Sequence, residues 1–317
     1  MSATATAKTN AKLRMSDVVA AGWSGCARYT GTMLSVFVTQ SIVALICLLM
    51  LAQVLASVFS HRPLFDEGVR GDLIALVWAT RHGASVLIAS VWLVIGVALM
   101  WSIVSWFLVG GINAVLIKNP QGRAATAQQF GAGGSNTFLA YGLLTVLSVP
   151  LLVLVLFVFG ITAGVAIPRM QYALTVPQLI APLTLALLPA LFLLAVTWTI
   201  VDYARLDLTR YRNSHALGPF AAYIRAVRFV VTHPLTVGHT LVGWLLWVGI
   251  GIGYSYIAYG HPMLGADGAL TLYVIRLGVQ LFRMAVKFGV IAGQVHVSAQ
   301  CIEPVRVDAD VMADTVA

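Results

Sequence analysis

The chain has 317 residues, of which only 9% are charged and 60% are hydrophobic. Soluble globular proteins carry about 25% charged residues, so this composition excludes a water-soluble domain and indicates that most of the chain lies in lipid. The 19 Lys and Arg outnumber the 11 Asp and Glu, which suits polar edges that touch anionic lipid headgroups. We do not expect a nucleic-acid partner, because no polar segment is large enough to form a binding face.

Six segments are apolar over about the 20 residues that a membrane-spanning helix needs. They are Gly31–Phe59, Ala84–Val109, Thr137–Ala163, Leu179–Val201, Pro234–Ile257 and Leu270–Ala292. We therefore predict an all-α polytopic membrane protein with six transmembrane helices. Its membrane domain covers residues 15–302, between a disordered cytoplasmic tail at 1–14 and a C-terminal tail at 303–317.

Amphipathic segments outside these spans predict elbow helices that lie in the membrane interface. In "GPFAAYIRAVRFVVTHP", apolar residues recur at helical spacing while Arg225 and Arg228 project elsewhere, which is typical of a basic, lipid-facing elbow. A second elbow begins near Ser16, ahead of the first span. The segment from Asp72 to His82 is either a third elbow or an irregular outer loop. The apolar face of the first segment consists of Phe220, Ile224, Val227 and Val231, and that of the second of Val18, Val19, Gly22, Trp23, Cys26 and Tyr29.

The orientation follows from the Lys and Arg residues outside the spans, because positive loops stay in the cytoplasm. Twelve lie on the side of the two termini and four on the opposite side. We therefore expect both termini in the cytoplasm and the chain in a bacterial inner membrane. The N-terminus lacks the short apolar core and cleavage site of a removable signal, so we expect it in the mature protein.

The stretch "VIRLGVQLFRMAVKFGVIAGQ" overlaps the last predicted span and ends just beyond it. It carries polar side chains on one helical face. At about 100° per residue these side chains fall within an arc of about 60°. Small residues occupy the opposite side, which favours close approach of another helix. The polar stripe consists of Arg276, Gln280, Arg283, Lys287 and Gln294, and the small face of Gly278, Ala285, Gly289, Ala292 and Gly293.

Three interpretations of the stripe remain open: static pairing inside the fold, a path for a ligand or ion, and snorkelling to the interface. A cation inside the membrane costs at least about 2.5 kcal/mol, so several on one face imply a partner or a wet groove. Asp202 and Asp207 are the acids near that membrane edge, and Asp202 could pair with Lys287. Each also has a local mate at i+3, Arg205 for Asp202 and Arg210 for Asp207. For Arg276 and Arg283 the options are backbone carbonyls at helix breaks, Gln40 and Gln53, or an anionic lipid phosphate.

Glycines at G-x-x-x-G spacing predict faces where helices pack closely. These pairs are Gly160 with Gly164, Gly249 with Gly253 and Gly289 with Gly293. Pro150, Pro182 and Pro189 lie inside predicted spans and predict kinks.

Motifs for cofactor binding or catalysis are missing from the sequence. Three widely spaced cysteines form no C-x-x-C pair, and the seven histidines show no metal-binding spacing. No nucleophile elbow, Walker loop or pair of intramembrane carboxylates appears. We therefore expect no cofactor, no metal and no enzymatic activity. An enzyme acting on lipid headgroups would need a base and a nucleophile together, which the sequence does not show.

Four segments carry a resemblance to a known group of proteins. "FLVGGINAVL", "VDYARLDL", "YIRAVRFVVTHP" and "LGVQLFRMAVKFGVIAGQV" resemble bacterial six-helix inner-membrane proteins akin to the membrane domain fused to some glycerophosphodiester phosphodiesterases. The resemblance covers most of the chain and implies a fold of elbow helices and spans. The phosphodiesterase catalytic domain is missing here, so that activity does not carry over.

Two functions are consistent with these features. The first is an accessory or scaffold subunit of a larger membrane assembly, with membrane lipids and other membrane subunits as partners. The alternative is a transporter or channel for an anionic solute or lipid headgroup that uses the cationic stripe.

Overall fold

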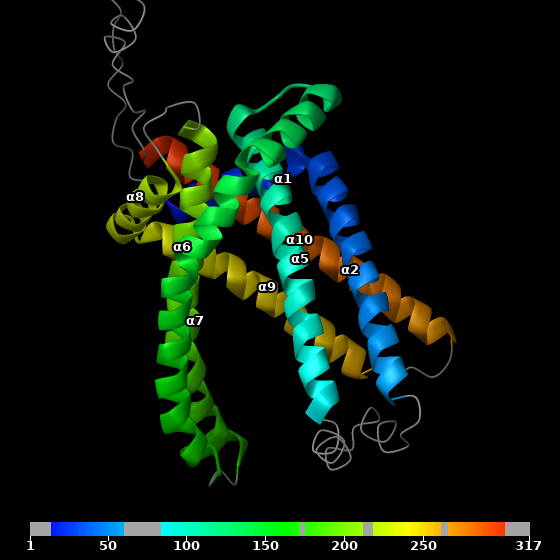
Figure 1. Ribbon diagram of the computed structural model, residues 1–317. Helices are drawn as coiled ribbons and strands as arrows, with labels where there is room; N and C mark the ends of the chain where they lie inside the picture. Colours follow the sequence, from blue (N-terminus) through cyan, green and yellow to red (C-terminus); the bar gives the residue numbers. More distant parts are fainter. Residues whose placement is uncertain (1–13, 60–83, 172–174, 212–217, 261–265, 302–317) are drawn as a thin grey trace, which may run out of the picture.

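The computed structural model describes residues 14–59, 84–171, 175–211, 218–260 and 266–301 (Figure 1). Within these ranges the chain forms eight helices and no strand, which confirms the predicted all-α class for the described part. The predicted tails, apart from Arg14, and the predicted elbow at 72–82 lie outside the described residues. The helices are α1 (Met15–Arg28), α2 (Thr30–Phe59), α5 (Ala84–Lys118), α6 (Arg123–Gln171), α7 (Val176–Tyr211), α8 (Pro219–Thr232), α9 (Leu235–Gly260) and α10 (Ala266–Cys301).

Five of the described helices, α2, α5, α6, α7 and α9, are long and apolar enough to cross a membrane. The sixth predicted span, Leu270–Ala292, is helical within α10 but is not one of the five. The physical reason is that Arg276, Arg283 and Lys287 interrupt its apolar sequence. The described helices therefore fit a multi-pass membrane protein, with five apolar spans rather than the six that the sequence predicted.

Large apolar side chains cover the outer surface of the long helices. Leu139 is 78% exposed, Leu245 71% and Leu156 67%. Apolar surface in contact with water costs roughly 25 cal/mol per Å², so a surface of this kind indicates lipid as the solvent.

The helices α1 and α8 lie toward one end of the bundle, which we call the closed end (Figure 1), and both buried apolar clusters include residues of these two helices or of α1 alone. One cluster surrounds Tyr141 and Leu144 of α6, and the other surrounds Val115 of α5 and Phe288 of α10. At this end α5 and α6 pack so closely that a Cβ on Gly110 or Gly133 would overlap the facing helix. The closed end is therefore where the chain forms its interior.

The connection between α5 and α6 is shorter than the sequence suggested. The helix α5 continues to Lys118 and α6 begins at Arg123, so only a tight turn remains, with φ of 50° at Asn119 and 87° at Gly122. The Asn119 Oδ1 accepts hydrogen bonds from the Tyr29 hydroxyl at 2.5 Å and from Arg28 Nη1 at 3.0 Å. These bonds attach the turn to the junction between α1 and α2.

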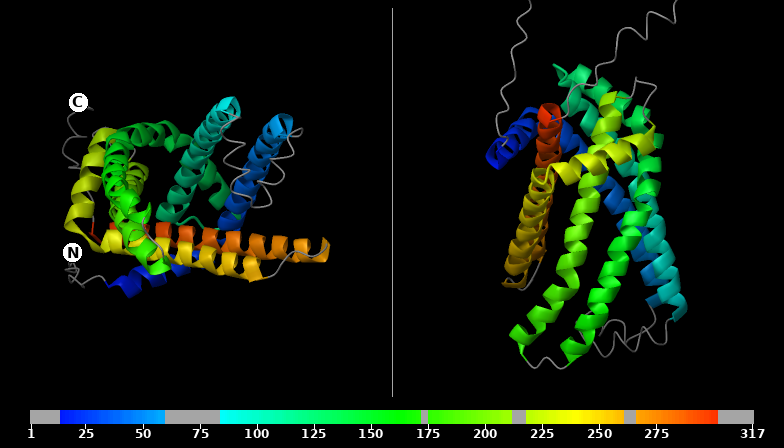
Figure 2. Two further views of the ribbon diagram at one scale, coloured as in Figure 1. Left: turned by 90° about the horizontal axis from the view of Figure 1, so that it is seen from below. Right: turned by 90° about the vertical axis from the view of Figure 1, so that its left-hand side faces the viewer.

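The helices α1 and α8 occupy the segments predicted as elbows. The helix α1 packs against α10, and α8 packs against α7 (Figure 2). In α8 the buried residues are Ala222, Ala226 and Val230. Most of its predicted apolar stripe points away from the bundle, since Phe220 is 63% and Val231 74% exposed. Ala222, Ala226 and Val230 thus face the protein, with Tyr223, Val227 and Phe229 packed beside them, while Phe220 and Val231 face outward.

Candidate functional site

The last three turns of α7 bring charged side chains together with residues of α8 and α10 at the closed end. We call this set the polar junction; its members are Asp202, Arg205, Asp207, Arg210, Arg225, Gln294 and Ser298. It lies beside the apolar cluster around Tyr141. Because buried charges are costly unless they are paired, the partners of each member decide what the junction can do.

Asp202 is paired within α7 and bound from α10. Its Oδ1 lies 3.4 Å from Arg205 Nη1. Gln294 is 1% exposed, and its Nε2 lies 3.4 Å from Asp202 Oδ2 and 3.5 Å from Thr240 Oγ1. The amide of Gln294 therefore connects α10 to α7 and α9. Lys287, the other predicted partner of Asp202, forms no ion pair with it, although the two charges attract each other.

Asp207 is paired with α8 and not with its predicted local mate. Arg225 donates to Asp207 Oδ2 from Nε at 3.0 Å and from Nη2. Arg210 instead reaches α10, where its guanidinium donates to the Ser298 carbonyl at 3.0 Å and to Ser298 Oγ at 3.1 Å. These two contacts fasten α8 and the end of α10 to the same stretch of α7. Arg228, the other predicted elbow cation, is exposed.

Tyr141 extends the network to α5 and α6. Asn113 Nδ2 donates to the Tyr141 hydroxyl at 2.9 Å, and both side chains are buried. The same hydroxyl lies 2.6 Å from Thr209 Oγ1 and 3.1 Å from the Arg205 carbonyl. The Asn113 amide nitrogen and the Tyr141 hydroxyl are thus bonded to another helix, as buried polar groups usually are, whereas Asn113 Oδ1 has no partner among the described residues.

The polar stripe of α10 meets different neighbours along its length. Arg283 turns toward α9, where its guanidinium lies 4.0 Å from the centre of the Trp247 ring and its Nε donates to the Trp247 carbonyl at 3.3 Å. Gly251 makes room for it, since a Cβ there would overlap the guanidinium. Carbonyl and ring thus supply the partner that the sequence left open for Arg283.

Lys287, Arg276 and Gln280 have no comparable contact. Each is exposed, and none forms a hydrogen bond or ion pair with another residue in the described ranges. Lys287 lines a recess between α2, α5 and α10. The stripe is therefore divided into buried Gln294, the ring-bound Arg283 and three accessible polar side chains.

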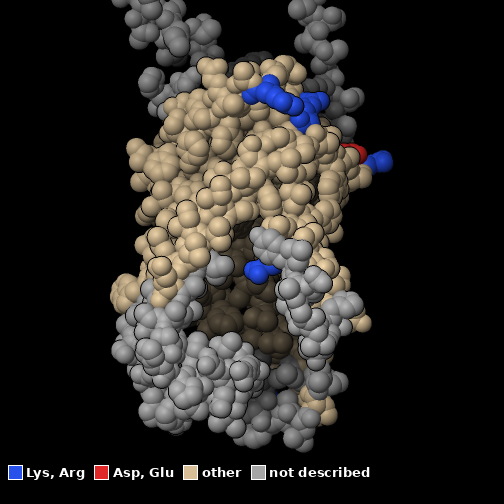
Figure 3. Space-filling view, turned by 90° about the vertical axis from the view of Figure 1, so that its right-hand side faces the viewer, with Lys and Arg blue, Asp and Glu red and all other residues tan. Residues whose placement is uncertain are grey.

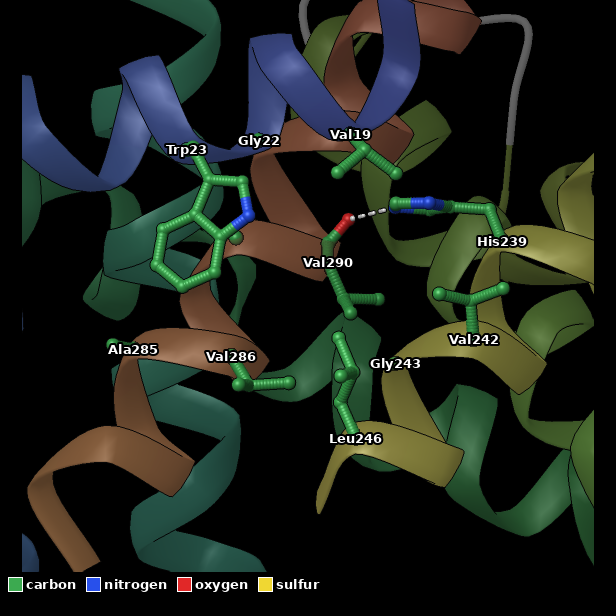
Figure 4. Close-up of a pocket in the computed structure, with 11 residues that line it drawn as sticks. Val19, Gly22, Trp23, His239, Val242, Gly243, Leu246, Ala285, Val286 and Val290 are labelled. Atoms are coloured by element: carbon green, nitrogen blue, oxygen red, sulfur yellow. Dashed lines mark hydrogen bonds between the residues drawn. The ribbon is translucent and has the colours of Figure 1, made fainter. Parts of the chain in front are cut away.

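The small-residue face of α10 lies against α1 and α9. A Cβ on Gly22 of α1 would lie 2.5 Å from the Gly289 carbonyl oxygen, and one on Gly293 would lie 2.5 Å from His239 Nε2. Figure 4 shows these helices around a small apolar pocket, with His239 directed at the Val290 carbonyl, 3.2 Å from its Nε2. Within the described residues the His239 Nδ1 is buried without a partner, and no three His, Cys, Asp or Glu side chains are grouped as a metal site would require.

The other predicted packing glycines do not meet another helix in the described part of the chain. Added Cβ atoms at Gly160 and Gly164 of α6, and at Gly249 and Gly253 of α9, would find no described atom within 4 Å. These four positions lie on exposed faces.

Sequence reasoning missed the contacts that link distant segments. Asp207 with Arg225, Arg210 with Ser298 and Tyr141 with Asn113 join residues whose positions along the chain reveal no pairing. The only available signal was that α7 concentrates acids and arginines at its end. Comparison with protein-family models, with curated proteins and with solved structures finds no match to this chain.

Proposed function

We propose that this chain is a non-enzymatic scaffold or accessory subunit of a larger membrane assembly. In this proposal α10 is the sixth span, α1 and α8 lie in the membrane interface, and both termini are on the cytoplasmic side of a bacterial inner membrane. The positive-side bias of the sequence supports this orientation. The amphipathic character of α1 and α8 supports their interfacial placement.

The observation that carries the proposal is the internal pairing of the polar junction. Asp202, Asp207 and Arg210 are each engaged by a side chain or carbonyl of the same chain. A buried charge that already has its partner is not free to act on a substrate, and removing the partner is strongly destabilising. The junction therefore fits a role in holding six helices in a fixed arrangement.

The outer surface supplies the second support. Glycine pairs on α6 and α9 are open in the single chain, and such pairs let a neighbouring membrane helix approach closely. Arg276 and Gln280 of α10 are also exposed. Polar groups on a membrane surface are stabilised when a partner covers them. A helix of another subunit would satisfy both features.

The alternative, transport of an anion along the stripe, finds less support. Arg283 is occupied by Trp247. Gln294 is buried between Asp202 and Thr240. A transport path would need these groups free to exchange partners with the moving anion.

The test is purification of the full chain in a mild detergent from its own host, followed by native mass spectrometry. We expect one or more protein subunits at fixed stoichiometry. The double variant Gly160→Leu/Gly164→Leu should lose a subunit, because bulky side chains block close approach. Gly96→Leu is the matched control, since Gly96 is also exposed and open but stands outside any glycine pair. A wild-type chain that appears only as a lone species contradicts the proposal.

A further inference from the structure

A recess between α2, α5 and α10 presents one cation and two neutral polar side chains. Lys287 comes from α10, Gln40 from α2 and Ser105 from α5. Figure 3 shows the side of the molecule on which α2 lies, where most of the described surface carries no Lys, Arg, Asp or Glu. The rest of the recess is apolar; its lining includes Leu108, Ile112, Met284, Phe288 and Ile291.

Lys287 has no counter-ion of its own in the described part of the chain. Asp202 attracts its ammonium group and Arg205 repels it. Asp202 is already in contact with Arg205 and Gln294. An ammonium in a membrane segment is costly unless an anion or water accompanies it. Since Lys287 is exposed to the recess, that anion can come from outside the chain.

The position of Lys287 along the membrane normal favours a lipid headgroup as the source of the anion. Gly22 of α1 meets the backbone of Gly289, two residues further along α10. At 1.5 Å per residue, Lys287 lies only about 3 Å along the helix axis from this crossing. This step rests on the interfacial position proposed for α1, which places Lys287 near the level of the lipid headgroups.

The helices that form the recess also carry exposed apolar side chains on their outer faces, which suit the acyl chains of a lipid. On α2, Ile42 is 54% and Leu45 55% exposed, and on α5 Ile103 is 48% exposed. These side chains offer an apolar surface along which acyl chains can lie. A free anion would gain nothing from them.

We propose that this recess binds the phosphate group of a membrane phospholipid, with the Lys287 ammonium as the counter-ion. The Gln40 amide supplies a neutral donor, and the exposed faces of α2 and α5 receive the acyl chains. Lysine serves as a point charge for phosphate, and such charge-assisted hydrogen bonds are stronger than neutral ones. Arg283 takes no part, because the Trp247 ring and carbonyl hold it on the α9 side.

The test titrates the purified, delipidated full chain with dioctanoyl phosphatidylglycerol and counts bound lipid by native mass spectrometry. Lys287→Gln should weaken the tightest binding event about tenfold. Lys287→Arg should retain it, and Arg283→Gln is the matched control that should bind like the wild type. Dioctanoylglycerol, which has the same acyl chains without phosphate, should bind weakly to all four proteins. Circular dichroism and gel filtration establish that each variant is folded.

Inorganic phosphate is titrated in parallel to separate the two sources of the anion. Lipid binding that depends on Lys287, without detectable binding of inorganic phosphate, supports the proposal. Equal lipid affinity of Lys287→Gln and Arg283→Gln overturns it. Binding of inorganic phosphate as tight as that of the lipid overturns the assignment to a phospholipid. Subunit co-purification is a separate measurement, so this proposal and the proposed function fail independently.

Discussion

Gly22 of α1 and Gly289 of α10 are in contact where the two helices cross, and we predict that they respond differently to substitution by alanine. A Cβ at Gly22 would lie 2.5 Å from the Gly289 carbonyl oxygen, whereas a Cβ at Gly289 would lie 3.7 Å from the Gly22 oxygen. Carbon and oxygen atoms approach to only about 3.3 Å even in favourable contacts, so Gly22→Ala must displace α1 by close to 1 Å. Gly289→Ala fits without movement.

The magnitude follows from two opposing effects. Overpacking of this kind costs about 1–3 kcal/mol, while alanine gains up to about 1 kcal/mol over glycine in a helix. For Gly22→Ala the net result is a loss of roughly 1–2 kcal/mol in the docking of α1, or about tenfold in its opening equilibrium. For Gly289→Ala there is no overpacking, so only the gain in helix stability of alanine over glycine remains.

Cys26 provides the assay, because it lies on α1, is 7% exposed and packs against Met33 at 3.5 Å between their sulfur atoms. In a background with Cys47 and Cys301 replaced by alanine, the rate of maleimide labelling reports the opening of α1. Gly22→Ala should accelerate labelling about tenfold, and Gly289→Ala should leave it unchanged or slow it. Equal labelling rates for the two variants would refute the reasoning.

Burial raises the pKa of the Cys26 thiol, so its reactive thiolate forms only at higher pH than that of a free cysteine. The rate of maleimide labelling of Cys26 in the wild type should therefore keep rising with pH beyond the point at which the labelling rate of free cysteine levels off. Arg225→Gln leaves the 7% exposed Asp207 carboxylate without its guanidinium and should lower the free energy of unfolding in detergent by about 3 kcal/mol; Arg228→Gln, at an exposed position, should change it by less than about 0.5 kcal/mol. Tyr141→Phe leaves buried Asn113 without its acceptor and should cost about 1–3 kcal/mol in the same unfolding experiment. Equal stability of the two arginine variants, or an unchanged stability of Tyr141→Phe, would contradict the contacts assigned to the polar junction.

The sequence predicted well those features that depend on local chemistry. The amphipathic segment quoted as the first elbow forms α8, which runs from Pro219 to Thr232. Helical class and the apolar spans followed from composition and length, because both depend on what surrounds the chain rather than on its tertiary contacts. Five of the six predicted spans are confirmed as long apolar helices in the described residues, and the sixth, at α10, where cations offset the apolar residues that surround them, stays a prediction.

Contacts between helices were harder to predict from the sequence, because helical spacing defines a face but not the neighbour that the face meets. Asp207 had Arg210 one turn away, yet the structure pairs it with Arg225 of another helix. The α8 segment shows the same limit. The spacing located its apolar residues, but Phe220, Ile224 and Val231 of that stripe are exposed, and Ala222, Ala226 and Val230 are the residues that are buried.

The stripe of α10 shows why one helical face can serve several purposes. Polar residues that share a face point in the same direction, but α10 contacts α1, α2, α5, α7 and α9 in turn along its length. Arg283 therefore reaches α9, Lys287 the recess beside α2, and Gln294 the buried end of α7. Among the described residues, the chain encloses the Gln294 end of the stripe and leaves Arg276, Gln280 and Lys287 exposed, so the cost of polar groups in the membrane falls on these three. Lipid and another subunit are the two partners that the proposals assign to them.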